Sequence, residues 1–201
     1  MNLDSVSSSA VRSVRQQDFL KVWFRTFNKT ARLPSLASFE PSRIEDEKPE
    51  LMYYDVTQNA GGDPRYRVSF AGARLVEAYG FNAVGRDLQD IISPSIWAHV
   101  EPLYDQCVLR KLPVYSVFAV ADLRNEVVAY ERLLLPFGEN DLVQQMIASI
   151  KSISSTEGRF VNTDLMRSKD HDPQYSLRAV VDQGTPDVRS RLADPDDVIE
   201  I

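Results

Sequence analysis

The residues that most often carry chemistry are scarce in this chain. It has two histidines, His99 and His171, and one cysteine, Cys107. No GxSxG motif occurs, and neither histidine stands in a motif that would place it beside an activated serine. The segment GARLVEAYG lacks the tight GxGxxG spacing of a phosphate-binding loop, and DPDD does not follow the calcium-loop pattern. The sequence therefore predicts no catalytic residue and no metal site, and we expect a protein that is not an enzyme.

Aromatic and apolar residues could instead line a pocket for a modest organic molecule, because aromatic walls with a few hydroxyl groups suit such a ligand. An arginine could anchor an acidic group through its two parallel N–H donors, and Arg67 and Arg132 are the candidates. Either arginine can equally be solvated or pair with Glu131 or Asp55, and the same apolar residues can simply fill a core. The ligand-pocket candidates are Leu75, Tyr79, Trp97, Val100, Tyr104, Tyr115, Tyr130 and Arg132.

An amphipathic helix is expected near the N-terminus. Ser13 and Gln16 have the capping-box spacing, in which each side chain can bond the other residue's backbone N–H. The residues that follow place Phe19, Trp23 and Phe27 on one stripe. This stripe can cover one face of a sheet, which is the interpretation we favour, or form the interface of a homodimer.

Strand and helix patterns follow a proline-broken connector that ends at residue 49. Residues 51–72 read as a hairpin, 73–79 as a short helix ended by Gly80, and 93–112 as a helical stretch opened by Ser-Pro. Pro102 predicts a kink there or two consecutive short helices. Three more strands are expected at 114–122, 127–136 and 143–153. Both faces of the strand at 114–120 are apolar, which predicts cover on both sides of the sheet.

Composition limits the partners and the compartment. The 201 residues carry a formal net charge of −6 without a concentrated basic face, so nucleic acid is not an expected partner. No signal-peptide core and no apolar run of membrane-spanning length occur, so we expect a cytoplasmic protein that does not bind membranes. Residues 155–201 hold ten acidic and six basic residues and few aromatics. They are expected to form a partly disordered acidic tail, with YSLRAVV as a possible docked segment.

The order of these segments resembles a PAS domain, and more narrowly the stand-alone PAS-like family found mainly in alphaproteobacteria. The matching elements are VWFRTFNKTARLPSLASFEP, RYRVSFAGARL, GFNAVGRDLQDI and YERLLLPFGEN, within residues 19–153. The resemblance implies an α+β fold with a five-stranded antiparallel sheet, small helices on one face, an N-terminal amphipathic helix and a C-terminal extension. The expected divisions are a flexible arm at 1–12, the helix and connector at 13–49, a PAS-like core at 50–154 and the tail at 155–201.

For function, the resemblance implies a sensory or regulatory module that binds a small molecule, a signalling protein partner, or both, with a possible homodimer through the N-terminal helix. The cofactor is left open. Flavin is not favoured, because GRDLQD, with Asp87, replaces the cysteine-containing turn of flavin photosensors. Haem is not favoured either, although His99 falls on the helix that supplies the ligand in haem sensors of this class.

Two alternatives come from other classes of protein. One is an enzyme of the ketosteroid-isomerase-like cone fold, with Asp122 or Glu131 as an interior general base. That fold places its long helices first, whereas this chain has a hairpin before its small helices. The other alternative is a structural adaptor whose core is filled.

Overall fold

The computed structural model describes residues 3–59, 61–121, 127–153 and 173–186. Their secondary structure follows the expected order, with an additional strand near each end. The elements are β1 Asp4–Val6, η1 Ser8–Ala10, α1 Val14–Thr30, η2 Leu36–Ser38, α2 Ile44–Glu47, η3 Lys48–Glu50, β2 Leu51–Gln58, β3 Pro64–Ala71, α3 Ala73–Tyr79, α4 Leu88–Ile91, α5 Pro94–Arg110, β4 Val114–Ala121, β5 Val127–Glu139, β6 Leu142–Ile153 and β7 Gln174–Val181.

The expected five-stranded antiparallel sheet is wrong. The described residues form a seven-stranded sheet in the order β1-β7-β4-β5-β6-β2-β3, and it is mixed because β1 pairs with β7 in parallel. The five strands expected from the sequence form the β4-β5-β6-β2-β3 part, in which every pairing is antiparallel. β7 then pairs with the free edge of β4, and β1 pairs with β7. The extension satisfies backbone N–H and C=O groups that an exposed β4 edge would leave unpaired.

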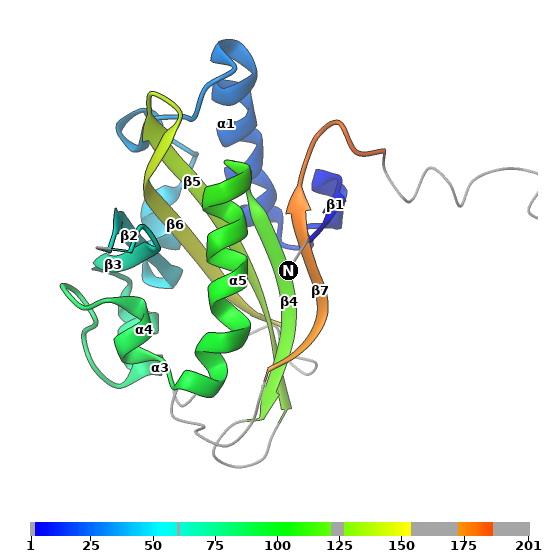
Figure 1. Cartoon of the computed structure of the whole chain (residues 1–201). Coiled ribbons are helices and arrows are strands. Elements are labelled where there is room, and N and C mark those ends of the chain that lie inside the picture. The colour runs from blue at the N-terminus through cyan, green and yellow to red at the C-terminus, as the bar shows by residue number, and fades with distance from the viewer. Residues whose placement is uncertain (1–2, 60, 122–126, 154–172, 187–201) are drawn as a thin grey trace, which may run out of the picture.

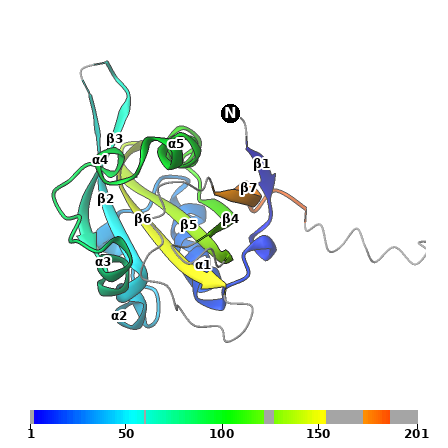
Figure 2. The same cartoon turned by 90° about the horizontal axis from the view of Figure 1, so that it is seen from below.

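Helices cover both faces of the sheet, with α5 on one face and α1 on the other (Figures 1 and 2). The alternation of side chains along β5 explains why both faces are buried. Arg132 lines a cavity with Val100 of α5, whereas Glu131 accepts a hydrogen bond from the backbone N–H of Ser13 at the start of α1. Adjacent residues of this strand therefore belong to two separate halves of the core.

α1 begins at the expected cap, where the Ser13 hydroxyl accepts from the Gln16 N–H at 3.4 Å. The reciprocal half of the capping box is not formed, because the Ser13 N–H donates to the Glu131 carboxylate at 3.3 Å. The buried Gln16 amide donates to the Ser149 carbonyl at 3.0 Å. Trp23 and Phe19 are buried within the chain's own core, and Phe27 stacks on Trp23. The stripe therefore packs on the sheet of its own chain.

The connector between α1 and β2 is fixed to the sheet by charge and by close packing. Lys151 of β6 forms ion pairs with both Glu47 and Glu50, and these three side chains are largely buried. Gly72 lies against the same segment, where a Cβ atom would overlap the carbonyl oxygens of Lys48 and Pro49. Gly72 therefore permits a close approach of two backbones, which is why no larger residue fits there.

α5 begins at the expected Ser93 cap with Pro94 in the first helical position. It continues as a single helix through Pro102, so the alternative of two short helices is wrong. α3 ends as expected at Gly80, whose φ of 75° is the left-handed conformation that glycine adopts without strain. Within the described ranges, no helix combines the length and apolar character needed to cross a bilayer.

Candidate ligand-binding sites

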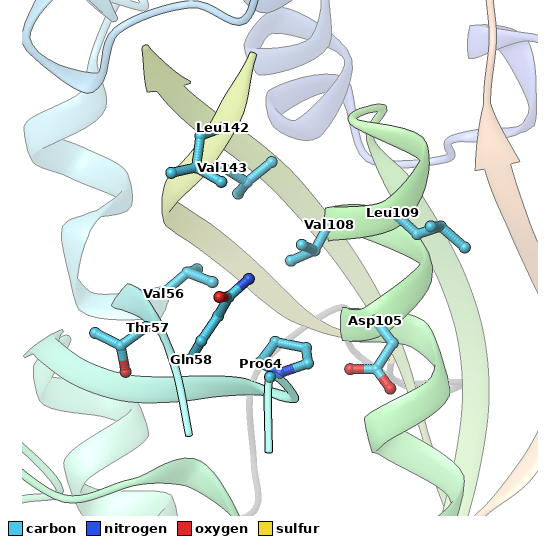
Figure 3. A pocket seen from close by; sticks show the side chains of 10 residues that line it. Val56, Thr57, Gln58, Pro64, Asp105, Val108, Leu109, Leu142 and Val143 are labelled. Atoms are coloured by element: carbon cyan, nitrogen blue, oxygen red, sulfur yellow. The ribbon is translucent and has the colours of Figure 1, made fainter. Parts of the chain in front are cut away.

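An open pocket of about 540 Å³, here called the end groove, lies between β2, β3, α5 and β6. Figure 3 shows side chains of β2, β3, α5 and β6 around it. Its volume is in the range of about 300–1,000 Å³ that small-molecule sites occupy. The lining residues are Val56, Thr57, Gln58, Gly62, Pro64, Asp105, Val108, Leu109, Leu142 and Val143.

The walls of the end groove are mainly apolar and come from regular elements. Val56 lies near the end of β2, Val108 lies on the last turns of α5, and Leu142 begins β6 after a tight turn. That turn places Asn140 and Asp141 at positive φ, a conformation that these two residue types tolerate better than most. Leu142 keeps 56 % of its surface exposed. An apolar ligand would therefore remove this leucine from water.

Asp105 is the ionisable residue among those that line the end groove. It is half-buried, and one oxygen accepts a hydrogen bond from the Tyr66 hydroxyl at 2.6 Å. Burial raises the pKa of Asp105, the bond from Tyr66 opposes this, and the nearby carboxylate of Asp63 raises the pKa further. The groove thus combines apolar walls with a carboxylate that is poorly compensated.

We expect Asp105→Asn to raise the unfolding temperature of the ligand-free protein at neutral pH. A carboxyl whose pKa is higher in the folded state binds its proton more tightly there, so stability falls as the pH rises from the unfolded-state pKa through the folded-state pKa. Asparagine keeps an oxygen for the Tyr66 hydroxyl but has no charge to desolvate. Thermal unfolding at a series of pH values should show a higher unfolding temperature for Asp105→Asn at pH values above the folded-state pKa of Asp105. Little difference from the parent protein is expected below the unfolded-state pKa. A gain that is equal at every pH would contradict this explanation.

The interior site expected from the sequence contains five of the candidates on the α5 side of the sheet. Val100 and Arg132 line a cavity of about 20 Å³. Tyr79 and Tyr104 are buried and interact electrostatically with the Arg132 guanidinium. Tyr130 is also buried, and its ring stacks on that of Phe118 with centroids 5.6 Å apart. These aromatic residues fill the space between sheet and helix, so this cavity has room for about one water-sized particle.

The remaining interior candidates lie elsewhere. Leu75 is buried in the core, and Trp97 is half-buried against Tyr66, with ring centroids 6.3 Å apart. Tyr115 lies on the α1 side of the sheet, where its hydroxyl donates to the Glu131 carboxylate at 2.5 Å. The structure therefore separates Tyr115 from the other candidates by the thickness of the sheet.

The two arginine candidates have different surroundings. Arg67 is exposed and forms an ion pair with Asp87, with 3.3 Å between the charged atoms. Arg132 is buried, and Glu131 points to the opposite face of the sheet. The solvated alternative is therefore wrong for Arg132, and the ion pair that was considered for it with Glu131 is not formed.

The residues considered for other chemistry lie apart from both cavities. His99 is half-buried on α5 and lines neither of them, and Asp122 and His171 lie outside the described residues. Glu131 is buried and accepts two hydrogen bonds, from Tyr115 and from the Ser13 backbone. Cys107 is buried, and burial raises the pKa of its thiol, as for a cysteine that packs as a small apolar residue. The described part of the chain holds no group of three or more side chains placed to bind a metal ion.

Sequence reasoning missed the end groove and the β7 side of the interior cavity. In the sequence, Asp105 looks like an ordinary acidic residue on a helix. It lines a pocket because the β2–β3 hairpin and β6 pack beside it in the folded chain. Tyr175 was visible as part of YSLRAVV, whose alternation of apolar and polar residues is typical of a strand.

No protein-family model and no curated protein matches this chain.

Proposed function

We propose that this protein is a cytoplasmic regulatory module of the PAS type, which binds a small organic cation in the end groove and acts on a protein partner. The ligand is an amine with a hydrocarbon body. Its ammonium group pairs with Asp105, and its body covers Val56, Val108 and Leu142. The resemblance in segment order supports the regulatory role, and the groove supports the class of ligand.

The observation that carries the proposal is the half-buried carboxylate of Asp105 in an apolar pocket of about 540 Å³. A charge in such a position costs free energy unless a partner compensates it. Tyr66 donates one hydrogen bond but brings no positive charge. Among the described residues, the other carboxylate that acts on Asp105 is that of Asp63, which raises its pKa further. A bound ammonium group would supply the missing charge, and Gln58 offers an additional amide oxygen.

Native mass spectrometry of protein purified from its own host tests whether a ligand is present. Titration calorimetry with a panel of alkyl and aralkyl amines, matched by the corresponding alcohols, then tests the class of ligand. We expect saturable binding of amines but not of the alcohols. Asp105→Asn should weaken amine binding about tenfold or more, because a hydrogen bond to a charged group is worth roughly 1.5–3 kcal/mol.

Two variants make the binding test specific. Asp90→Asn makes the same chemical change on α4, outside the groove, and should bind amines like the parent protein. Val108→Phe should fill the groove and prevent binding while Asp105 is unchanged. Equal affinity for amines and alcohols, or an Asp105→Asn protein that binds amines normally, would contradict the proposal.

A structural adaptor is the second candidate, and the filled interior around Tyr79, Tyr104 and Tyr130 favours it. An adaptor needs no ligand. The absence of any bound mass, together with failure of every amine to bind, would support the adaptor over the sensor.

A further inference from the structure

The guanidinium of Arg132 is buried in the core with 5 % of the residue exposed. Its Nε and Nη1 atoms have no hydrogen-bond partner among the described residues. Buried charges are normally paired, because the loss of hydration is otherwise uncompensated. Within the described part of the chain, Nε and Nη1 of Arg132 therefore lack the acceptors that a buried guanidinium normally has.

The protein surrounds this cation with rings rather than carboxylates. The guanidinium lies over the Phe118 ring at 4.9 Å from the centroid and over the Tyr104 ring at 6.0 Å. These cation–π contacts recover part of the cost, but aromatic rings cannot accept the in-plane N–H bonds of a guanidinium. A second cation, Arg178, lies 4.9 Å from the centroid of Tyr175. The local charge of these described side chains is positive.

A small cavity of about 20 Å³ adjoins Arg132, and β7 forms one of its walls. Tyr175 of β7 lines it and has a buried hydroxyl without a hydrogen-bond partner. Arg132 lies close enough to this hydroxyl to lower its pKa against the larger effect of burial, yet the two groups do not form a well-aligned hydrogen bond. The other lining residues are apolar: Ile96, Val100, Phe118, Val120 and Pro173.

Three polar atoms without hydrogen-bond partners thus belong to the two polar residues that line a space of one-water size. A cavity needs about 10–15 Å³ to hold a water molecule, so this one admits a single small particle. A water molecule could donate one hydrogen to the Tyr175 hydroxyl oxygen, but its other hydrogen would face apolar walls and the charge of Arg132 would stay uncompensated. A small anion accepts from all three donors and neutralises the charge.

We propose that this cavity is a binding site for a small monovalent inorganic anion of halide size, held by Arg132 Nε and Nη1 and by the Tyr175 hydroxyl. The anion joins β5 to β7, since Arg132 belongs to β5 and Tyr175 to β7. β1 pairs only with β7 among the described strands, so the anion also secures β1. The anion site is independent of the end groove and of the amine ligand proposed for it.

Halide titration of the whole protein tests this site. Protein dialysed into sodium gluconate receives sodium chloride or bromide at constant ionic strength, and the unfolding temperature and the ³⁵Cl line width are measured. We expect the unfolding temperature to rise with halide concentration, because a ligand that binds only the folded state stabilises it by mass action. Crystals grown with bromide should show anomalous density between Arg132 and Tyr175.

Matched variants assign the effect to these residues. Arg132→Met should abolish the halide response, whereas Arg25→Met on the exposed side of α1 should retain it. Tyr175→Phe should weaken halide affinity about tenfold, in line with one hydrogen bond to a charged group, whereas Tyr53→Phe, beside Phe70, should leave it unchanged. If Arg132→Met does not fold, Tyr175→Phe and the bromide density still decide. A halide response that persists in Tyr175→Phe at full affinity, no response in the parent protein, or a water molecule in place of bromide would overturn the proposal.

Discussion

Replacing Lys151 with methionine is expected to destabilise the protein by about 3–5 kcal/mol, as breaking a buried ion pair does. Lys151 neutralises two carboxylates, those of Glu47 and Glu50, which are each less than a tenth exposed. Methionine keeps most of the volume but leaves both carboxylates in the core with less compensation. Arg15 and Arg74 still contact them, but from more exposed positions. Urea unfolding followed by tryptophan fluorescence measures the loss.

A nearby exposed ion pair supplies the control. Lys48 pairs with Glu45 at 2.6 Å on the same connector, and both side chains are exposed. Lys48→Met should cost less than about 1 kcal/mol, because exposed ion pairs contribute little. Adding Glu47→Gln and Glu50→Gln to Lys151→Met should recover much of the stability, since no unpaired charge then remains buried. Equal losses for the two lysine variants would contradict the buried network.

Local features of the sequence predicted the elements well, because each of them depends on neighbouring residues. Ser13 and Ser93 mark the two long helices through cap bonds within three residues of themselves. Gly80 ends α3 through its own backbone conformation. The hairpin at 51–72 followed from two β-rich runs around a turn, and the structure has β2 and β3 there. These signals need no knowledge of the remaining fold.

The pairing of β7 and β1 with the rest of the sheet could not be predicted from local sequence. β7 pairs with β4 through contacts such as Val180 with Val114, which lie far apart in the sequence. β1 has only three residues, Asp4–Val6, and a run of that length shows no periodicity. Its strand conformation depends on the edge that β7 presents. The resemblance implied five strands and an extension, and it carried no information on where the extension would dock.

The surroundings of the candidate site residues also depend on contacts between residues that are far apart in the sequence. Arg132 was named from the sequence as a possible anchor for an acidic group, but Tyr175, which lines the same cavity, comes from β7. Asp105 gains its environment from Tyr66 of β3, which is 39 residues away. Tyr115 and Tyr130 were grouped from their strands, although the register places them on opposite faces. The face on which a strand residue lies depends on the register of strand pairing, and that register is set by the whole sheet.

Trp23→Ala is expected to cost about 3–5 kcal/mol, the usual loss for a large aromatic residue removed from a core. Trp23 is fully buried, and its indole N–H donates to the Pro136 carbonyl of β5 at 2.7 Å. The alanine variant loses both the packing and this hydrogen bond. Trp23→Phe keeps most of the packing but leaves the carbonyl without its donor, so it should cost about 1–3 kcal/mol. Val14→Ala on the same helix, at a residue that is 76 % exposed, should cost less than about 0.5 kcal/mol.

The same variant distinguishes the two uses considered for the α1 stripe. If Trp23 acts within its own chain, the loss of stability is independent of protein concentration, because no second copy takes part in unfolding. If the stripe formed a homodimer, the unfolding midpoint of the parent protein would rise with concentration, and Trp23→Ala would remove that dependence. Urea unfolding at protein concentrations a hundredfold apart, with light scattering for the molar mass, separates the two cases. The burial of Trp23 and Phe19 against the sheet leads us to expect no concentration dependence from these residues. Phe27 stacks on Trp23 and is the partly exposed member of the Phe19, Trp23 and Phe27 stripe, so a dimer contact through this stripe would have to use Phe27.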